Sequence, residues 1–250
     1  MTPVLTDPRL IVGLDLPSID AARAMVDRID GTITAYKIGL TLLARPGGVA
    51  FAHELRARGR TVFQDWKLHD SGAQVEGAAR AVAEGGCDLL TVHAEPQVMR
   101  GAVKGRDAAG SDTKLLAVTV LTSLSDADLG ELGYGAGAAE LVERRVRQAL
   151  DCGMDGVVSS PLEAAKVRAL ADAAGRPDFL VVTPGVRPAG ADLGDQQRVA
   201  TPVDALRAGA SHLVVARPVV AAENPLRAAS AIVAAIDGVA RQAQPRSPGS

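Results

Sequence analysis

Charged side chains interrupt two apolar segments of this chain at positions where buried strands would end. Asp65, Lys67 and Asp70 follow one another at the end of one segment, and Lys37 lies in the segment before it. Because side chains alternate across an extended strand, Asp65 and Lys67 share one face. An isolated Asp or Lys there is also explained by an ion pair between neighbouring strands. Two carboxylates and two ammonium groups, however, can form an alternating neutral array, which predicts a functional site.

Two arginines in the last quarter of the chain indicate an anion-binding site. Arg187 lies in a Pro-Gly-Val-Arg-Pro turn, Arg217 directly follows the last apolar segment, and Gln196 lies between them. Guanidinium groups bind a phosphate dianion through paired hydrogen bonds, and backbone N–H groups and an amide can complete the cage. Two solvated surface arginines are the alternative, but the turn at the end of an apolar segment favours the phosphate site.

Eight short segments rich in Val, Ile, Leu and Thr are the predicted strands that position these residues. They cover residues 10–16, 35–39, 61–67, 88–94, 114–121, 156–159, 179–183 and 212–216. Amphipathic Ala-rich stretches between them are predicted helices, at residues 21–29, 73–84, 138–150, 162–173 and 203–208. Strict alternation predicts an α/β protein with a parallel sheet. Eight units without a linker favour a single (β/α)8 TIM barrel over residues 1–240, with a doubly wound open sheet as the alternative.

Local signals mark some helix boundaries and the end of the chain. Ser160 and Thr201 each precede a proline and are followed three residues later by an acidic residue, which predicts two capped helix N-termini. The polar tail, residues 241–250, is predicted to be disordered. In a barrel of this kind the reacting residues lie at the carboxyl ends of the strands, and phosphate binds after strands seven and eight. The charged residues and the arginines occupy these places.

Composition limits the class of protein. The 250 residues are 47% hydrophobic and 22% charged, which is typical of a globular protein. A formal net charge of −2 with 2% aromatic residues predicts no nucleic-acid partner. No apolar run reaches the roughly 18 residues of a membrane span, and the N-terminus does not resemble a signal peptide, so we expect a cytoplasmic protein. Cys87 and Cys152 lie far apart, which predicts free thiols and neither a disulfide nor a metal site.

From about Leu10 to Arg227 the chain resembles the orotidine 5′-phosphate decarboxylases of the bacterial type. The motifs that carry the resemblance are Gly13-Leu-Asp15, Tyr36-Lys-Ile-Gly39, Phe63-Gln-Asp-Trp-Lys-Leu-His-Asp70, Thr91-Val-His-Ala94, Ala117-Val-Thr-Val-Leu-Thr-Ser123, Asp155-Gly-Val-Val-Ser159, Val182-Thr-Pro-Gly-Val-Arg-Pro188, Gly194-Asp-Gln196 and Ala216-Arg-Pro218. The resemblance implies conversion of orotidine 5′-phosphate (OMP) to UMP, the last step of de novo pyrimidine biosynthesis, without metal or organic cofactor. It also implies a homodimer of (β/α)8 subunits.

The resemblance also implies roles for individual residues near the reacting carbon. Lys67 is the general acid that protonates C6 of the pyrimidine, and Asp65 lies against the substrate carboxylate. Lys37 bridges the charged array and a ribose hydroxyl, and Asp15 binds the ribose. Asp70 reaches into the neighbouring subunit's site.

Further residues are implied in substrate binding. Thr122 matches a threonine near the base, and the phosphate ligands are Arg187, Gln196 and Arg217. His69 and His93 lie beside these residues in the sequence, and for them we favour a supporting hydrogen-bonding role over a direct one.

Two positions depart from the usual pattern of this family. Gln74 replaces a threonine that helps to bind substrate across the dimer, so we expect weaker binding rather than loss of chemistry. Ala216 replaces the glycine that usually precedes the phosphate arginine, and its methyl group would crowd the phosphate if the backbone there needs a positive φ.

Two other functions remain open from the sequence. One is a metal-dependent sugar-phosphate decarboxylase or epimerase of the same barrel group, whose sites use an acidic metal ligand where this chain has Lys37; a requirement for Mg²⁺ would support it. The other is a non-catalytic nucleotide-binding barrel, which only Gln74 and Ala216 favour.

Overall fold

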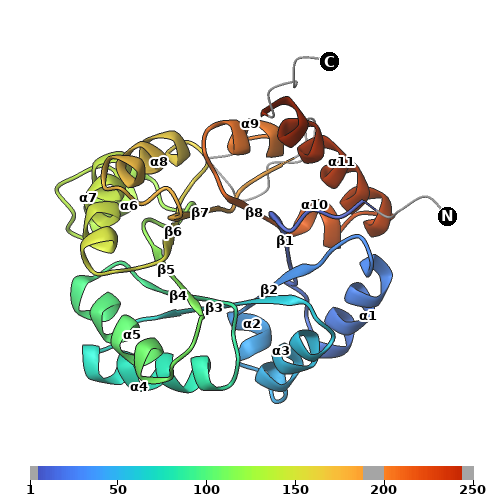
Figure 1. Ribbon diagram of the computed structural model, residues 1–250, viewed down its shortest axis with the longest axis horizontal. Coiled ribbons are helices and arrows are strands. Elements are labelled where there is room, and N and C mark those ends of the chain that lie inside the picture. Colours follow the sequence, from blue (N-terminus) through green and yellow to red (C-terminus); the bar gives the residue numbers. More distant parts are fainter. Residues whose placement is uncertain (1–4, 188–199, 244–250) are drawn as a thin grey trace, which may run out of the picture.

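Eight parallel strands close into a barrel in the order of the sequence, which confirms the predicted (β/α)8 fold and excludes the open sheet (Figure 1). The computed structural model describes residues 5–187 and 200–243. The strands are β1 (Leu10–Gly13), β2 (Ala35–Gly39), β3 (Thr61–Leu68), β4 (Leu89–His93), β5 (Lys114–Val118), β6 (Gly156–Val158), β7 (Leu180–Thr183) and β8 (His212–Val215).

Helices surround the ring of strands (Figure 1). They are α1 (Ile19–Ile29), α2 (Leu40–Leu43), α3 (Gly48–Ala57), α4 (Gly72–Glu84), α5 (Pro96–Ala108), α6 (Asp126–Glu131), α7 (Ala138–Asp151), α8 (Ala164–Ala173), α9 (Pro202–Arg207), α10 (Arg217–Val220) and α11 (Pro225–Ala243). The five helices predicted from amphipathic stretches correspond to α1, α4, α7, α8 and α9, with boundaries that differ by up to two residues.

The alternation of side chains along the strands divides the apolar core into two layers. One set faces into the barrel and consists of Ile11, Ala35, Phe63, Leu89, Leu116, Val182 and Val214. The larger set lies between the strands and the helices, and Trp66 packs against it from the end of β3, as its position in the strand predicts. The apolar inward set leaves the carboxyl end of the barrel as the place for the charged side chains.

Two predicted strands end earlier in the structure than in the sequence analysis. β1 ends at Gly13 rather than at residue 16, and β5 ends at Val118 rather than at residue 121. Apolar character continues past each strand for different reasons. Val120 and Leu121 after β5 line a cavity at the carboxyl end of the barrel, whereas Leu14 and Leu16 after β1 pack with the core between the strands and the helices. Hydrophobicity alone therefore overstated the length of both strands.

Of the two predicted helix caps, one is confirmed and one is wrong. The hydroxyl of Thr201 accepts the backbone N–H of Asp204 at 3.2 Å and begins α9, with Pro202 in the first turn. Ser160 instead accepts the N–H of Leu162 at 3.2 Å in a turn, and α8 begins only at Ala164. The same local signal thus closes a short turn at one site and begins a helix at the other.

Other predictions concern the cysteines, membrane spans and the tail. Cys87 and Cys152 are free thiols, as predicted. In the described part of the chain, no helix has the length and apolarity needed to cross a bilayer. Helix α11 continues to Ala243, three residues beyond the domain end predicted at residue 240, and residues 244–250 of the predicted tail lie outside the described residues.

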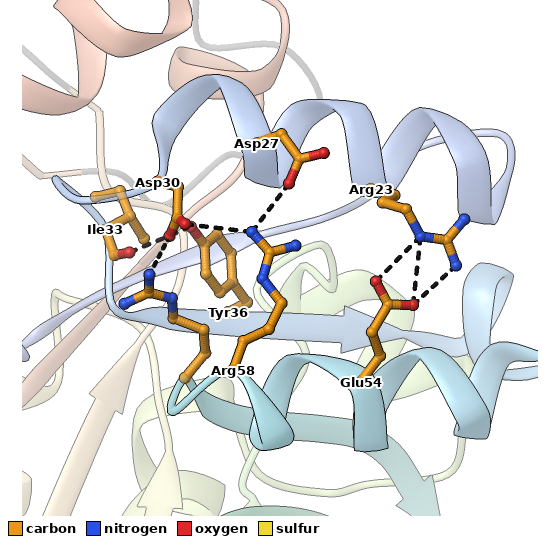
Figure 2. A network of polar contacts seen from close by, with 8 residues as sticks. Arg23, Asp27, Asp30, Ile33, Tyr36, Glu54 and Arg58 are labelled. Carbon is orange, nitrogen blue, oxygen red and sulfur yellow. Dashed lines mark hydrogen bonds and ion pairs between the residues drawn. The ribbon is translucent and has the colours of Figure 1, made fainter.

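A polar network connects α1 with α3 and with the beginning of β3 (Figure 2). Arg23 of α1 forms an ion pair with Glu54 of α3 at 2.8 Å, and Arg58 pairs with Asp27 at 2.9 Å and with Asp30 at 3.2 Å. The side chains of these pairs are partly exposed to solvent, so each pair contributes little to the free energy of unfolding. They connect the helices that precede β2 and β3, the strands that carry the predicted catalytic lysines.

Candidate active site

A cavity of about 490 Å³ opens at the carboxyl ends of the strands and brings together most of the predicted site residues. Eight of them line it, namely Asp15, Lys37, Asp65, Lys67, Thr122, Arg187, Ala216 and Arg217. Apolar side chains, including Phe63, Val158 and Val214, form much of the remaining wall. The cavity therefore has charged groups of both signs beside an apolar surface, as a site for a nucleotide requires.

The charged groups alternate in sign across the site. Nζ of Lys37 lies 3.1 Å from Oδ1 of Asp15 and 3.4 Å from Oδ2 of Asp65, and Nζ of Lys67 lies 2.8 Å from that same Oδ2. A Cβ atom added to Gly39 would lie 3.1 Å from Asp15 and 3.2 Å from Lys37. The glycine at the end of β2 therefore leaves room for the array itself.

Electrostatic interactions keep the buried members of the array charged. Burial by itself would lower the pKa of Lys37, but the carboxylates of Asp65 and Asp15 outweigh burial and raise this pKa above the usual lysine value. Burial would likewise raise the pKa of Asp65, but Lys37 and Lys67 outweigh it, and the pKa lies below the usual aspartate value. At neutral pH both groups are therefore ionised, although only 11% of each side chain is exposed.

The backbone of β3 is irregular where it presents these side chains. The register between β3 and β4 shifts between Gln64 and Leu68, and Lys67 within this shift has φ +50°. Thr91 of β4 faces the irregular segment and hydrogen-bonds to both Lys67 and Asp65. Thr91 belongs to one of the family motifs, but its role cannot be predicted from the sequence, because its partners depend on strand register, which local sequence does not show.

Asp70 and Gln74 do not line the cavity. Within one subunit the second carboxylate of the alternating array is therefore that of Asp15, and not that of Asp70 as predicted from the spacing of the charges. Asp70 is exposed after β3, where its Oδ1 accepts the backbone N–H of Ser71 at 2.6 Å, and Gln74 is exposed in the first turn of α4. The resemblance assigned both to contacts across a dimer, and a single subunit neither tests nor contradicts that assignment.

The two predicted phosphate arginines both line the cavity but differ in burial. Arg187 is buried after β7, and its backbone N–H donates to the carbonyl of Ala200 at 3.0 Å. Arg217 is exposed and is the first residue of α10. Gln196, the third predicted phosphate ligand, lies outside the described residues.

The backbone at Ala216 does not have the positive φ at which its methyl group was expected to crowd the phosphate. Its backbone has φ −111° and ψ −89°, so the position does not require the left-handed conformation that favours glycine. Its Cβ would lie 3.0 Å from a Cβ placed on Gly13. The methyl group therefore packs over the glycine at the end of β1.

His69 and His93 form a pair beside the site rather than part of its lining. Their ring centres lie 4.6 Å apart, and Nε2 of His69 lies 2.7 Å from Oε2 of Glu95. Burial, together with the nearby His69, lowers the pKa of His93. The supporting role of both histidines stays a prediction.

No cluster of three or more acidic, histidine or cysteine side chains that could hold a metal ion occurs in the described segments. Lys37, at the position where related metal-dependent barrels carry an acidic ligand, lies with its ammonium group between two carboxylates. The ammonium group of Lys37 is therefore the cation at the centre of the array. The arrangement can stabilise a developing negative charge and supply a proton beside it.

Comparison of the sequence with known proteins identifies its family. Residues 8–232 match the model of the family described as "Orotidine 5'-phosphate decarboxylase / HUMPS family". The chain is 61% identical over 233 residues to a protein named orotidine 5′-phosphate decarboxylase from Caulobacter vibrioides, with 93% of this chain and 99% of that protein covered. A protein of the same name from Methylobacterium radiotolerans is 53% identical over 232 residues, with 92% of this chain and 97% of that protein covered.

A solved structure is similar in both fold and sequence. The crystal structure of orotidine 5′-phosphate decarboxylase from Lactobacillus acidophilus superposes with a TM-score of 0.80 and is 34% identical, covering 92% of this chain and 100% of that one. The family match spans every strand and the cavity that they surround. The chain therefore belongs to the orotidine 5′-phosphate decarboxylase / HUMPS family.

Proposed function

We propose that this protein is an orotidine 5′-phosphate decarboxylase that converts OMP to UMP and CO₂ without a metal or organic cofactor. The observation that carries the proposal is the Lys67 ammonium group, which lies 2.8 Å from a buried carboxylate of Asp65 inside a nucleotide-sized cavity. Relatives at 61% and 53% identity bear the name of this activity.

The chemical step needs a fixed cation. When the bond between C6 and the carboxylate breaks, CO₂ leaves and the electron pair stays on C6. No enolate or imine absorbs this charge, so the transition state is stabilised by a positive group already in place. Lys67 supplies that group, donates a proton from Nζ to C6, and regains a proton from solvent.

The rest of the array keeps Lys67 charged and in place. Asp65 faces the substrate carboxylate, and two carboxylates that face each other disfavour the bound ground state. Lys37 holds Asp65 ionised and, with Asp15, binds the ribose hydroxyls. Asp15 is half-exposed at the mouth of the array, which suits a group that contacts the sugar.

Arg187, Gln196 and Arg217 bind the phosphate, and Thr122 contacts the base. The phosphate is distant from C6, so its binding energy contributes to the rate only if it favours the arrangement that the transition state requires. Two arginines in one cavity supply the paired donors that a phosphate dianion accepts.

The active unit is a homodimer in which Asp70 and Gln74 contribute to the partner's site. Both residues are exposed and lie outside the cavity of their own subunit, which leaves them available for such a contact. The reaction takes place in the cytoplasm.

The test is loss of OMP absorbance with purified protein in EDTA, with identification of the product as UMP. Lys67→Ala is expected to lower kcat by at least about 100-fold. Lys104→Ala is the matched control, since Lys104 is an exposed lysine on α5 paired with Glu76, and we expect it to leave the rate unchanged. Dependence on Mg²⁺ would favour the metal-dependent alternative. UMP binding without conversion of OMP would favour the non-catalytic barrel.

A further inference from the structure

The carboxyl end of β3 contains a bulge that faces a single residue of β4. Gln64 pairs with Leu90 and Leu68 pairs with Val92, so residues 65, 66 and 67 of β3 lie opposite Thr91 alone. Within the described segments, Lys67 is the only residue besides glycines with a positive φ. A lysine in this left-handed region is strained and persists only where neighbouring contacts hold it.

The hydroxyl of Thr91 makes two hydrogen bonds inside this bulge. Its Oγ1 accepts the backbone N–H of Lys67 at 2.9 Å and donates to Oδ1 of Asp65 at 2.8 Å. Because an ionised carboxylate can only accept, the hydroxyl hydrogen points at Asp65 and an oxygen lone pair faces Lys67. Thr91 is completely buried, so bulk water cannot replace either contact. One side chain thus supports the strained backbone and the carboxylate together.

The other carboxylate oxygen of Asp65 forms ion pairs with both lysines. Oδ2 of Asp65 lies 2.8 Å from Nζ of Lys67 and 3.4 Å from Nζ of Lys37. With Oδ1 held by Thr91, the carboxylate cannot rotate without breaking a buried hydrogen bond. The orientation of Asp65, and through it the place of both ammonium groups, therefore depends on Thr91.

We propose that Thr91 is a positioning residue whose hydroxyl orients the Asp65 carboxylate and stabilises the left-handed backbone of Lys67, so that the Lys67 ammonium group is held ready for reaction. This inference rests on the proposed function, in which Lys67 is the proton donor. It concerns the rate of the chemical step, since the hydrogen bonds of Thr91 go to Asp65 and Lys67 rather than to the phosphate arginines.

The first test replaces the hydroxyl while keeping the shape of the side chain. Thr91→Val is expected to lower kcat for OMP by about 10- to 100-fold, the range expected for loss of a buried hydrogen bond to a charged group. KM is expected to change by less than about threefold, because phosphate binding is retained. Thr91→Ser keeps the hydroxyl, and we expect its kcat to lie within about threefold of the wild type.

Two further readouts separate positioning from general loss of stability. Removal of the donor raises the pKa of Asp65, so the acid limb of kcat/KM moves to higher pH in Thr91→Val and stays in place in Thr91→Ser. The amide hydrogen of Lys67 also loses its acceptor, so its exchange with solvent is faster in Thr91→Val, measured without substrate.

Thr113→Val is the matched control. Thr113 is buried, and its hydroxyl donates to the carbonyl of Cys87 at 2.6 Å just before β5, at the opposite end of the barrel from the cavity. Thr113→Val thus removes a buried threonine hydroxyl, as Thr91→Val does. We expect it to lower the thermal midpoint comparably while leaving kcat and the acid limb unchanged.

The outcomes distinguish this inference from the proposed function. If the wild type does not convert OMP, the proposed function fails, and the amide exchange of Lys67 still tests the contact itself. If the wild type is active and Thr91→Val retains full kcat, or Thr91→Ser is impaired equally, the hydroxyl has no positioning role. Should Thr91→Val not fold, Thr91→Ala and Thr91→Ser give the same comparison, and equal rates in that pair overturn the inference.

Discussion

Replacement of Lys37 by methionine is expected to destabilise the protein because it leaves the buried carboxylate of Asp65 with one cation fewer. Lys37 and Asp65 are each 11% exposed, and their charged atoms lie 3.4 Å apart. At an effective dielectric constant of about 20 this separation corresponds to an attraction of about 5 kcal/mol. Removal of Lys37 also relieves its own desolvation, and Asp65 keeps Lys67. We therefore expect a net loss of about 2–3 kcal/mol in the free energy of unfolding at pH 7.

The loss of stability in Lys37→Met is expected to depend on pH, in a direction set by the pKa of Asp65. The pKa of Asp65 in the folded wild type lies below the unfolded value, so its contribution to stability is present above that unfolded value and is lost as pH falls through the folded pKa. In Lys37→Met the folded pKa of Asp65 rises. The difference in stability between wild type and Lys37→Met is therefore largest near neutral pH and becomes smaller below about pH 4.

Urea unfolding at pH 7 and at a pH below about 4 measures this difference. Lys104→Met serves as control, since Lys104 pairs with Glu76 on the surface with 72% of its side chain exposed, and its loss should cost no more than about 1 kcal/mol. The double variant Lys37→Met/Asp65→Asn, which removes both charges, should recover part of the lost stability. A Lys37→Met protein as stable as the wild type, or a double variant less stable than Lys37→Met, would refute the electrostatic reasoning.

Two further predictions concern the phosphate end and the dimer. Ala216→Gly should leave KM for OMP within about twofold of the wild type in steady-state kinetics, because φ at this position is −111°; a large drop in KM would show that the methyl group crowds the phosphate. Mixing inactive Asp70→Asn and Arg187→Ala subunits should restore about a quarter of the wild-type activity, because half of the dimers are hybrids with one intact site. No recovery after confirmed subunit exchange would place Asp70 in its own subunit's site or outside catalysis.

The geometry shows how a small array can be both buried and charged. Asp15, Lys37, Asp65 and Lys67 alternate in sign, so each buried charge has an opposite charge within 3.4 Å. The neutral total avoids the cost of an unpaired buried ion. Burial of this array still costs more free energy than burial of an apolar cluster of the same size. A purely structural role would therefore not explain it.

The sequence by itself determined the architecture and most of the site. Eight apolar segments recur along the chain with amphipathic stretches between them, and this pattern is local, so it can be read without knowledge of the fold. A barrel then places every residue that follows a strand at one end. That rule, with the family motifs, was enough to select Lys37, Asp65, Lys67 and Arg217, which line one cavity.

Only the tertiary structure decided how these side chains are held. The signal at Ser160 predicted a helix cap but forms a turn. Leu162 beside it is 61% exposed, whereas α8 begins at Ala164, the first residue of its buried face. The left-handed backbone of Lys67 and the two hydrogen bonds of Thr91 depend on the register between β3 and β4. Thr91 and Asp65 are 26 residues apart, and strand register is set by packing of the whole barrel, so no local pattern could reveal this contact.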